Sequence, residues 1–241
     1  HLEDREAIAE ILRDFNFALL VTAGPEGLEA THLPLLHEPD TEGQGFGRLL
    51  GHLARGNGQC RAMERLAESG GEALAVFQGP HAYVSPTWYG DNGPATVPTW
   101  NYLAVHIYGQ PRLHTEPEAT ESILKKLAAR QESSLPEPWT MERVDAAQRT
   151  HMRRGVLAFE LPIGRLEAKA KLSQNRTAEQ RRSLEGEWRG ANHDDSRALA
   201  AWMERLRGEL QCPRHKVPLK DPNAAGSSRA RPGPRSSRPC S

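Results

Sequence analysis

The chain has 241 residues, of which 37% are hydrophobic and 26% charged, and this composition predicts a folded domain of ordinary size rather than an extreme class of protein. Its 31 basic and 31 acidic side chains give no net charge, but residues 211–241 hold seven Lys or Arg and one Asp. The rest of the chain is therefore mildly acidic and lacks the excess of basic residues that binds the phosphates of duplex DNA. The sequence has no run of about 18 apolar residues, the length that spans a membrane, so we expect a cytoplasmic protein with no membrane partner.

The first third of the chain alternates between helical and strand-like spacing of apolar residues. Ile8, Ile11 and Leu12 lie at helical spacing, whereas the GPEG stretch at positions 24–27 is typical of a tight turn between two strands. These patterns predict helices over residues 3–15 and 59–66, strands over residues 17–22, 28–36, 46–54 and 73–77, and a polar loop over residues 37–45.

The middle of the chain is predicted to be extended and rich in aromatic residues. Pro86 disfavours helix at Ser85, so we expect residues 83–89 to be extended, followed by a glycine- and proline-marked loop over residues 90–96. Residues 97–108 then predict a two-faced strand that suits a barrel. One face would hold Trp100, Tyr102, Ala104, His106 and Tyr108, and the other Thr99, Asn101, Leu103, Val105 and Ile107.

The last part of the chain predicts helices around one more pair of strands. We expect capping boxes at Thr115 with Glu118 and at Thr177 with Gln180. Strands scattered between isolated helices favour an α+β fold around a small antiparallel, Greek-key-like barrel over alternating βαβ units. The predicted elements are helices over residues 117–130, 141–153, 178–188 and 196–210, and strands over residues 155–161 and 164–169 with a bend at Pro162.

Common catalytic and metal-binding patterns are absent from the sequence. It contains no G-x-G-x-x-G, P-loop, G-x-S-x-G or H-E-x-x-H pattern, and we predict no catalytic residue. Cys60, Cys212 and Cys240 include no C-x-x-C pair, and Cys212 with His215 supplies too few ligands for a structural zinc ion. We therefore predict neither a disulfide framework nor a metal site.

Three stretches combine residue types that suit a bound anion or a planar ring. The GHLARGN stretch at positions 51–57 offers an Arg and glycines at the end of a strand, and KLSQNR at positions 171–176 offers cations and amides before a capped helix. The aromatic block over residues 83–102 would wall a ring or fill a dimer interface. Taken alone, the GHLARGN stretch is explained better by an ordinary strand-to-helix turn, whereas helix capping and core packing explain the other two stretches as well as a ligand does.

Together, these segments resemble the PaiB-like FMN-binding negative transcriptional regulators, relatives of the pyridoxamine-phosphate-oxidase-like split barrels. The matching stretches span about residues 17–175 and read FALLVTAGPEGLEATHLPLL, GHLARGN, EALAVFQGPHAYVSPTWY, VPTWNYLAVHIYG and KLSQN. The resemblance implies a split β-barrel with peripheral helices, and a homodimeric flavoprotein with FMN between its subunits that acts as a repressor. On this basis we expect a flavin-binding domain over residues 1–176, helices packed on it over residues 177–210, and a disordered basic tail over residues 211–241.

The resemblance also implies a set of flavin-binding positions, which are Thr22, His52, Arg55, Asn57, Trp100, Asn101, Lys171, Ser173, Gln174 and Asn175. The chain departs from the family pattern in two places. The loop after Tyr89 lacks the usual lysines, and Ala168 and Ala170 stand where the family has Gly and Trp. Loss of that aromatic side chain would weaken flavin binding or leave the pocket wetter.

Three functions remain open at the level of sequence. The first is an FMN-binding negative regulator that acts through DNA or a regulatory protein partner, although no helix-turn-helix signature is present. The second is an FMN-dependent oxidoreductase, in which the protein positions the cofactor. The third is a non-enzymatic carrier of flavin or haem, with His52, His81 or His106 as an iron ligand.

Overall fold

Helices and strands are interspersed along the whole chain in this computed structural model, which describes residues 1–41, 43, 45–90, 97–208 and 219–220. The helices are α1 (Arg5–Asp14), α2 (Gln59–Ser69), α3 (Pro117–Glu132), α4 (Ala146–Arg154), α5 (Ala178–Arg189) and α6 (Asp194–Arg205), with short 3-10 helices η1 (Pro86–Tyr89) and η2 (Met141–Arg143). The strands are β1 (Phe17–Gly24), β2 (Gly27–Pro34), β3 (Leu36–Glu38), β4 (Arg48–Ala54), β5 (Ala73–Val84), β6 (Thr99–Gly109), β7 (Arg112–His114), β8 (Val156–Pro162), β9 (Arg165–Lys171) and β10 (Leu219–Lys220).

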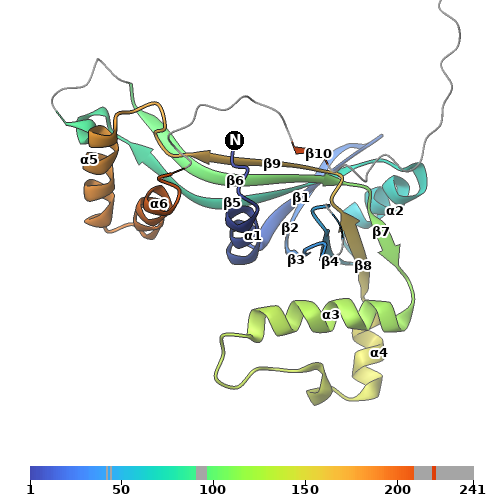
Figure 1. The fold of residues 1–241 in the computed structure, drawn as a ribbon. Coiled ribbons are helices and arrows are strands. Elements are labelled where there is room, and N and C mark those ends of the chain that lie inside the picture. The colour runs from blue at the N-terminus through green and yellow to red at the C-terminus, as the bar shows by residue number, and fades with distance from the viewer. Residues whose placement is uncertain (42, 44, 91–96, 209–218, 221–241) are drawn as a thin grey trace, which may run out of the picture.

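The strands form two sheets whose described pairings are all antiparallel (Figure 1). The larger sheet has the order β10-β9-β6-β5-β1-β2, and the smaller has the order β3-β4-β8-β7. β8 and β9 follow one another in sequence but belong to different sheets, so the bend after Pro162 carries the chain from one sheet to the other. This arrangement confirms the predicted antiparallel α+β architecture.

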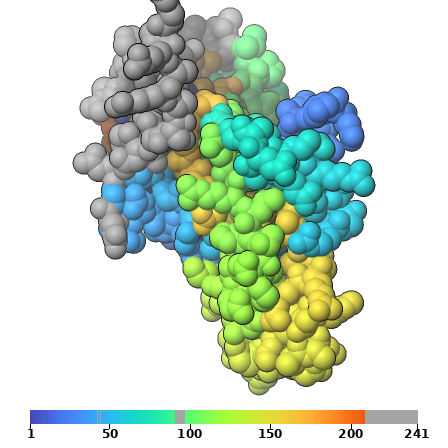
Figure 2. Space-filling model, turned by 90° about the vertical axis from the view of Figure 1, so that its right-hand side faces the viewer, coloured from blue at the N-terminus to red at the C-terminus, as the bar shows by residue number. Residues whose placement is uncertain are grey.

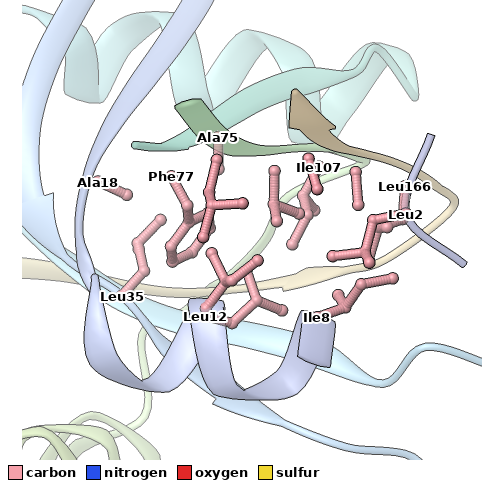
Figure 3. Close-up of a cluster of buried hydrophobic side chains, with 14 of the residues drawn as sticks. Leu2, Ile8, Leu12, Ala18, Leu35, Ala75, Phe77, Ile107 and Leu166 are labelled. Carbon is pink, nitrogen blue, oxygen red and sulfur yellow. The ribbon is translucent and has the colours of Figure 1, made fainter. Parts of the chain in front are cut away.

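The main hydrophobic core lies between the two sheets and helix α1. Leu12 and Ile8 of α1 point towards Phe77 and Ile107 of the larger sheet, as Figure 3 shows, and all four side chains are buried. At 3.6 residues per turn, the spacing of the apolar residues in α1 presents one stripe to this core. This stripe covers the inner face of the larger sheet. Because successive residues of a strand point to opposite faces, every second residue of each strand lies on the outer face.

Helices α3 and α4 lie on the far side of the smaller sheet. Ile123 and Leu127 of α3 pack with Leu50 of β4 and Ala158 of β8 in a second, smaller cluster. Helix α4 has no buried residue. The two helices form part of a lobe that projects from the body of the molecule (Figure 2). Helices α5 and α6 pack against each other at one end of the larger sheet, and α2 lies at the other end (Figure 1).

Local signals in the sequence predicted most of these elements correctly. The two faces expected for residues 97–108 are present in β6, where Asn101, Leu103, Val105 and Ile107 are buried and the alternate residues are partly exposed. Thr177 and Gln180 form the predicted capping box of α5 with both reciprocal hydrogen bonds. The residues of the 90–96 loop other than Gly90 lie outside the described part of the chain.

Two predicted features of local structure were wrong. Residues 83–85 are extended as predicted, with Tyr83 and Val84 in β5, but Pro86–Tyr89 forms η1, which begins where the Ser85 hydroxyl accepts a hydrogen bond from the Thr87 amide. Thr115 does not cap α3, whose N-cap is Glu116 without a side-chain hydrogen bond. A proline at the first helical position fixes the backbone there and donates no N–H, so the start of α3 needs no capping box.

Other segments differ in their boundaries. The single helix expected over residues 141–153 is divided into η2 and α4, because Asp145 caps a new helix with a hydrogen bond to the Gln148 amide. Residues 36–38 were predicted to be the end of one strand and the start of a polar loop, but they form a separate short strand, β3. The strands β7 and β10 were not predicted. β10 lies in the tail that was expected to be disordered, and the rest of that tail, residues 211–218 and 221–241, lies outside the described part of the chain.

Candidate functional site

Three of the predicted site residues lie together where β4 leads into α2, and we call Thr22, Arg55 and Asn57 the α2-end group. Arg55 is exposed in the turn after β4, and its guanidinium has no hydrogen bond or ion pair with another described side chain. The first amides of α2 are already bonded, because Gln59 N–H donates to Asn57 Oδ1 and the Cys60 and Arg61 amides donate to the Asn57 and Gly58 carbonyls. The same turn also holds Gly56 and Gly58, both exposed. A cation beside glycines, where a ligand can approach the backbone closely, is a suitable environment for a phosphate.

Asn57 is held in place by hydrogen bonds rather than left free for a ligand. Its Nδ2 donates to Thr31 Oγ1 at 2.9 Å, and its Oδ1 accepts from the Gln59 amide at 2.9 Å. Asn57 therefore ties the start of α2 to β2. Thr22 is 2% exposed, and its Oγ1 accepts from Gln59 Nε2 at 3.2 Å.

The second group lies at the opposite end of the larger sheet, near α5, and we call it the α5-end group. Its members are Trp100, Asn101, Lys171, Ser173, Gln174 and Asn175. Ser173 is buried with a left-handed φ of 58°, and its Oγ lies 2.9 Å from Asn101 Nδ2 and 2.7 Å from the Tyr89 hydroxyl. Such a backbone conformation is unfavourable for serine and persists only where surrounding contacts stabilise it.

Within the α5-end group, some side chains are engaged locally and others are exposed. Gln174 Oε1 accepts from the Leu172 amide at 2.8 Å, and Gln174 Nε2 donates to the Ala170 carbonyl, so this side chain stabilises its own turn. Lys171 Nζ donates to Thr99 Oγ1 at 2.6 Å. Asn175 is exposed, and the Trp100 side chain, 53% exposed, meets the Tyr83 ring edge-on at 6.1 Å.

The two groups are far apart within one chain. Val21 of β1 pairs with Leu74 of the antiparallel β5, so Thr22, the next residue of β1, lies beside the first residue of β5. Asn101 pairs with Ala82, near the other end of β5. The β5 segment between residues 73 and 82 corresponds to roughly 30 Å at ~3.3 Å per residue. A single FMN molecule does not reach both groups of one subunit.

Partly exposed apolar side chains lie on the outer face of the larger sheet near its α2 end, and this face becomes polar towards the α5 end at Gln78 and Lys169. Cross-strand rows of this face contain Val21, Leu74 and Tyr108, and Leu19, Val76 and His106. Towards β2 the face ends in Phe17 and Leu28, which are 66% and 78% exposed. Exposed large apolar side chains on one sheet face are a common feature of interaction sites.

His52 is placed apart from the α2-end group, on the face of the smaller sheet that α3 covers. It lies two residues beyond Leu50, which packs on α3, and opposite Ala158. His52 Nδ1 is buried without a hydrogen-bond partner among the described residues, and burial lowers the pKa of this imidazole from its usual value. His81 and His106 lie on the larger sheet, and the described residues contain no cluster of three or more His, Cys, Asp or Glu suited to a metal ion.

Sequence analysis missed several polar residues around the two groups. Gln59 is 2% exposed beneath the start of α2, and Glu29 lies opposite Thr22 in the β1–β2 hairpin. Tyr89, which completes the Ser173 cluster, was considered only as part of an aromatic block. Only the fold brings these residues to the groups, although the position of Gln59 two residues after Asn57 is a local signal that was available.

Comparisons with known proteins identify relatives along most of the chain. Residues 1–165 match the family described as "Putative FMN-binding domain", whose description names the cofactor predicted above. The chain is 29% identical over 205 residues to "Protease synthase and sporulation protein PAI 2" of Bacillus subtilis, covering 83% of this chain and 91% of that protein. It is 28% identical over 235 residues to an uncharacterized protein of Emericella nidulans, covering 85% and 93% of the two chains.

Two solved structures share the fold at low sequence identity. One is the FAD and heme binding protein from Mycobacterium smegmatis, with a TM-score of 0.50, 16% identity and coverage of 76% of this chain and 78% of that one. The other is a "putative 5-nitroimidazole antibiotic resistance protein" from Bacteroides thetaiotaomicron, with a TM-score of 0.50, 13% identity and coverage of 69% and 84%. Together with the two antiparallel sheets, these likenesses confirm the predicted split β-barrel fold class.

No helix in the described part of the chain combines the length and apolar character needed to cross a bilayer. This finding agrees with the sequence, in which the longest apolar runs are short.

The half-buried imidazole of His52 leads us to expect that the stability of the fold depends on pH. The lowered pKa means that the folded state resists protonation of this imidazole, whereas the unfolded chain takes up a proton near the ordinary histidine value of about 6.5. The stabilisation is complete above that pH and is lost as the pH falls towards the folded pKa. We expect the free energy of unfolding in urea to fall more between about pH 7.5 and pH 5.5 in the wild type than in His52→Phe. Equal losses in the two proteins would contradict this assignment.

Proposed function

The chain belongs to the family described as "Putative FMN-binding domain", and from this premise we propose that it is a homodimer that binds FMN between its subunits and acts as a negative transcriptional regulator of the PaiB type. The α2-end group of one subunit would meet the phosphate, and the α5-end group of the other subunit would meet the isoalloxazine ring. Each dimer would then contain two equivalent sites.

The observation that carries this proposal is the separation of the two groups at opposite ends of one sheet. Both groups contain residues suited to a flavin, yet one chain keeps them roughly 30 Å apart. A two-fold axis that runs across the strands would lay the α2 end of one sheet over the α5 end of another. The apolar outer face, with Leu19, Val21, Leu74 and Val76, would be buried between the two copies.

The residues present fit FMN in kind. Arg55 supplies an exposed cation, and the exposed Gly56 and Gly58 in the same turn let a phosphate approach the backbone closely. Asn101 Oδ1 is a buried acceptor without a donor among the described residues, and a flavin ring carries an N–H that such an acceptor can bind. When bound, FMN supplies hydride- and electron-transfer chemistry.

The α5-end residues divide into two proposed roles. Ser173 and Gln174 would position the turn after β9, because their polar atoms are bonded within the protein. Trp100, Lys171 and Asn175 would contact the cofactor, because each presents exposed or partly exposed polar or aromatic surface. Ala170 is buried opposite Leu103, whereas Trp100 lies on the other, exposed face of β6, so Trp100 would contact the cofactor at a different place from the Trp of the family pattern.

The regulatory role rests on the relationship to a protein named for protease synthesis and sporulation. The described residues bring no acid and base together at either group in the manner of a proton-transfer site. We therefore place regulation ahead of oxidoreductase activity as the role of this flavoprotein.

A mixing experiment tests whether the site is shared between subunits. Arg55→Ala and Lys171→Ala each remove one charge, and each homodimer should bind FMN at least about tenfold more weakly than the wild type, measured by quenching of flavin fluorescence. In a refolded equimolar mixture, about a quarter of all sites should regain wild-type affinity, because half of the dimers are mixed and each has one intact site.

The control for this mixture is Arg61→Ala, which removes another exposed cation from α2 and should leave affinity unchanged. If the mixture shows no tight sites although mixed dimers form, both groups act within one subunit and the shared site is wrong. A monomer that binds FMN with wild-type affinity would also contradict the proposal.

A second experiment tests the regulatory role. The FMN-loaded dimer should enrich particular fragments from a genomic DNA library, and its affinity for them should fall steeply with salt because phosphate contacts release counterions. It should oxidise reduced nicotinamide no faster than free FMN does. Turnover well above that of free FMN, with no enriched fragment, would favour an oxidoreductase instead.

A further inference from the structure

Helix α4 has its polar residues partly buried and its apolar residues exposed. The partly buried residues of the helix are all polar, namely Arg149, Thr150 and Arg153. The Arg153 guanidinium is bonded to the Glu121 carboxylate of α3, so this side of α4 faces the protein. Ala147 and Met152 are exposed, and no residue of the helix is buried. A surface helix normally has the opposite orientation, with its apolar residues against the core.

The outward side of α4 lines a hollow of about 600 Å³ that is open to solvent. The lining residues are Val144, Ala147, Gln148, His151 and Met152. They recur at i, i+3, i+4, i+7 and i+8, the spacing that places residues on one side of a helix. A small-molecule pocket encloses most of its ligand, whereas this hollow is open. Its shape therefore suits an elongated partner that lies across α4.

The position of α4 keeps this surface accessible in the proposed dimer. The helix belongs to the lobe that projects from the body of the molecule, where α4 is the yellow segment of Figure 2. The lobe is attached to the smaller sheet through contacts of α3 with Leu50 and Ala158. The proposed dimer buries the outer face of the larger sheet instead. The second copy in such a dimer leaves α4 uncovered.

Exposed cations lie at both ends of the hollow. α4 contains three arginines and one histidine but no acidic residue. Arg154 continues the row of Ala147 and His151 along the helix, and Arg143 directly precedes Val144. Both arginines are exposed, and neither guanidinium has a hydrogen bond or ion pair with another described side chain. A partner with negative charge complements this surface.

The acidic residues just before α4 are already engaged within the protein. Glu142 Oε1 lies 3.1 Å from Lys125 Nζ, and Asp145 Oδ1 accepts a hydrogen bond from the Gln148 amide at 2.9 Å. The basic segment over residues 211–241 of the chain itself does not fit the hollow, because it holds seven Lys or Arg and one Asp. The charges therefore favour a separate, acidic partner over this segment.

We propose that the outward side of α4 is a docking surface for an amphipathic, acidic helix of a protein partner. Apolar side chains of that helix would fill the hollow, and its Asp or Glu side chains would lie beside Arg143 and Arg154. Recognition of a helix in this way uses apolar anchors at i, i+3, i+4 and i+7. Met152 suits such a surface, because a flexible methionine side chain adapts to different apolar groups. The docking surface does not depend on the flavin site.

A displayed peptide library tests the docking surface on the full chain. The peptides are about 18 residues long, or about five helical turns, with apolar residues fixed at helical spacing and the other positions random. They are selected on the wild type and then depleted of those that bind Met152→Glu. The retained peptides should contain more Asp and Glu than the starting library, because the cations beside the hollow attract them.

Dissociation constants of the retained peptides are then measured by fluorescence anisotropy. Met152→Glu and Ala147→Glu each place a carboxylate in the hollow and should weaken binding at least about tenfold. Arg154→Ala should weaken it about threefold to tenfold, and added salt should weaken the wild type more than this variant. Ala147→Glu keeps the test informative if Met152→Glu lowers the midpoint of thermal unfolding.

The matched control is Leu135→Glu, which changes another exposed apolar side chain of the lobe outside the hollow. It should leave peptide affinity unchanged, and every variant should bind FMN as the wild type does. Equal losses in Leu135→Glu, or retained peptides no richer in Asp and Glu than the library, would overturn the proposal. So would the failure to recover any peptide that binds the wild type better than both α4 variants. If the wild type binds no FMN, the proposed function fails while this docking surface stands.

Discussion

The extended backbone of β5 and β6 sets the distance between the two groups of candidate residues. Their register places Thr22 beside one end of β5 and Asn101 beside the other. A paired strand in a sheet is stiff, and its length follows from its residue count at ~3.3 Å per residue. No rearrangement of loops brings the groups together within one chain. A flavin site that uses both groups therefore needs a second subunit.

Hydrogen bonds inside the protein divide the candidate residues into those that shape the site and those that remain available. Asn57, Ser173 and Gln174 are bonded to neighbouring protein groups. Arg55 and Asn175 are exposed. The polar residues predicted from motifs therefore include some that hold the local structure and some whose side chains are available to bind a cofactor. The motif alone does not distinguish the two.

Sequence reasoning predicted the features that depend on local periodicity and missed those that depend on contacts between distant segments. The stripe of α1 and the two faces of β6 follow from spacing, and both were predicted. The short strand β7 has three residues and carries too little pattern to be recognised. The Tyr89–Ser173 hydrogen bond joins residues 84 positions apart, and no local signal in either segment specifies it. The same limit applies to the candidate site, because sequence placed ten residues in one site and the fold separates them into two groups and His52.

The most direct test is a distance measured between two copies of the chain. In a background without the native cysteines, one preparation carries a spin label at Arg61 in α2 and the other carries one at Asn175, and the two are mixed and loaded with FMN. The account predicts a dipolar coupling between chains that corresponds to a separation clearly shorter than the intrachain span of roughly 30 Å given by the strand register. No coupling between chains, or a separation equal to or longer than that span, would contradict a flavin site shared across the outer sheet face.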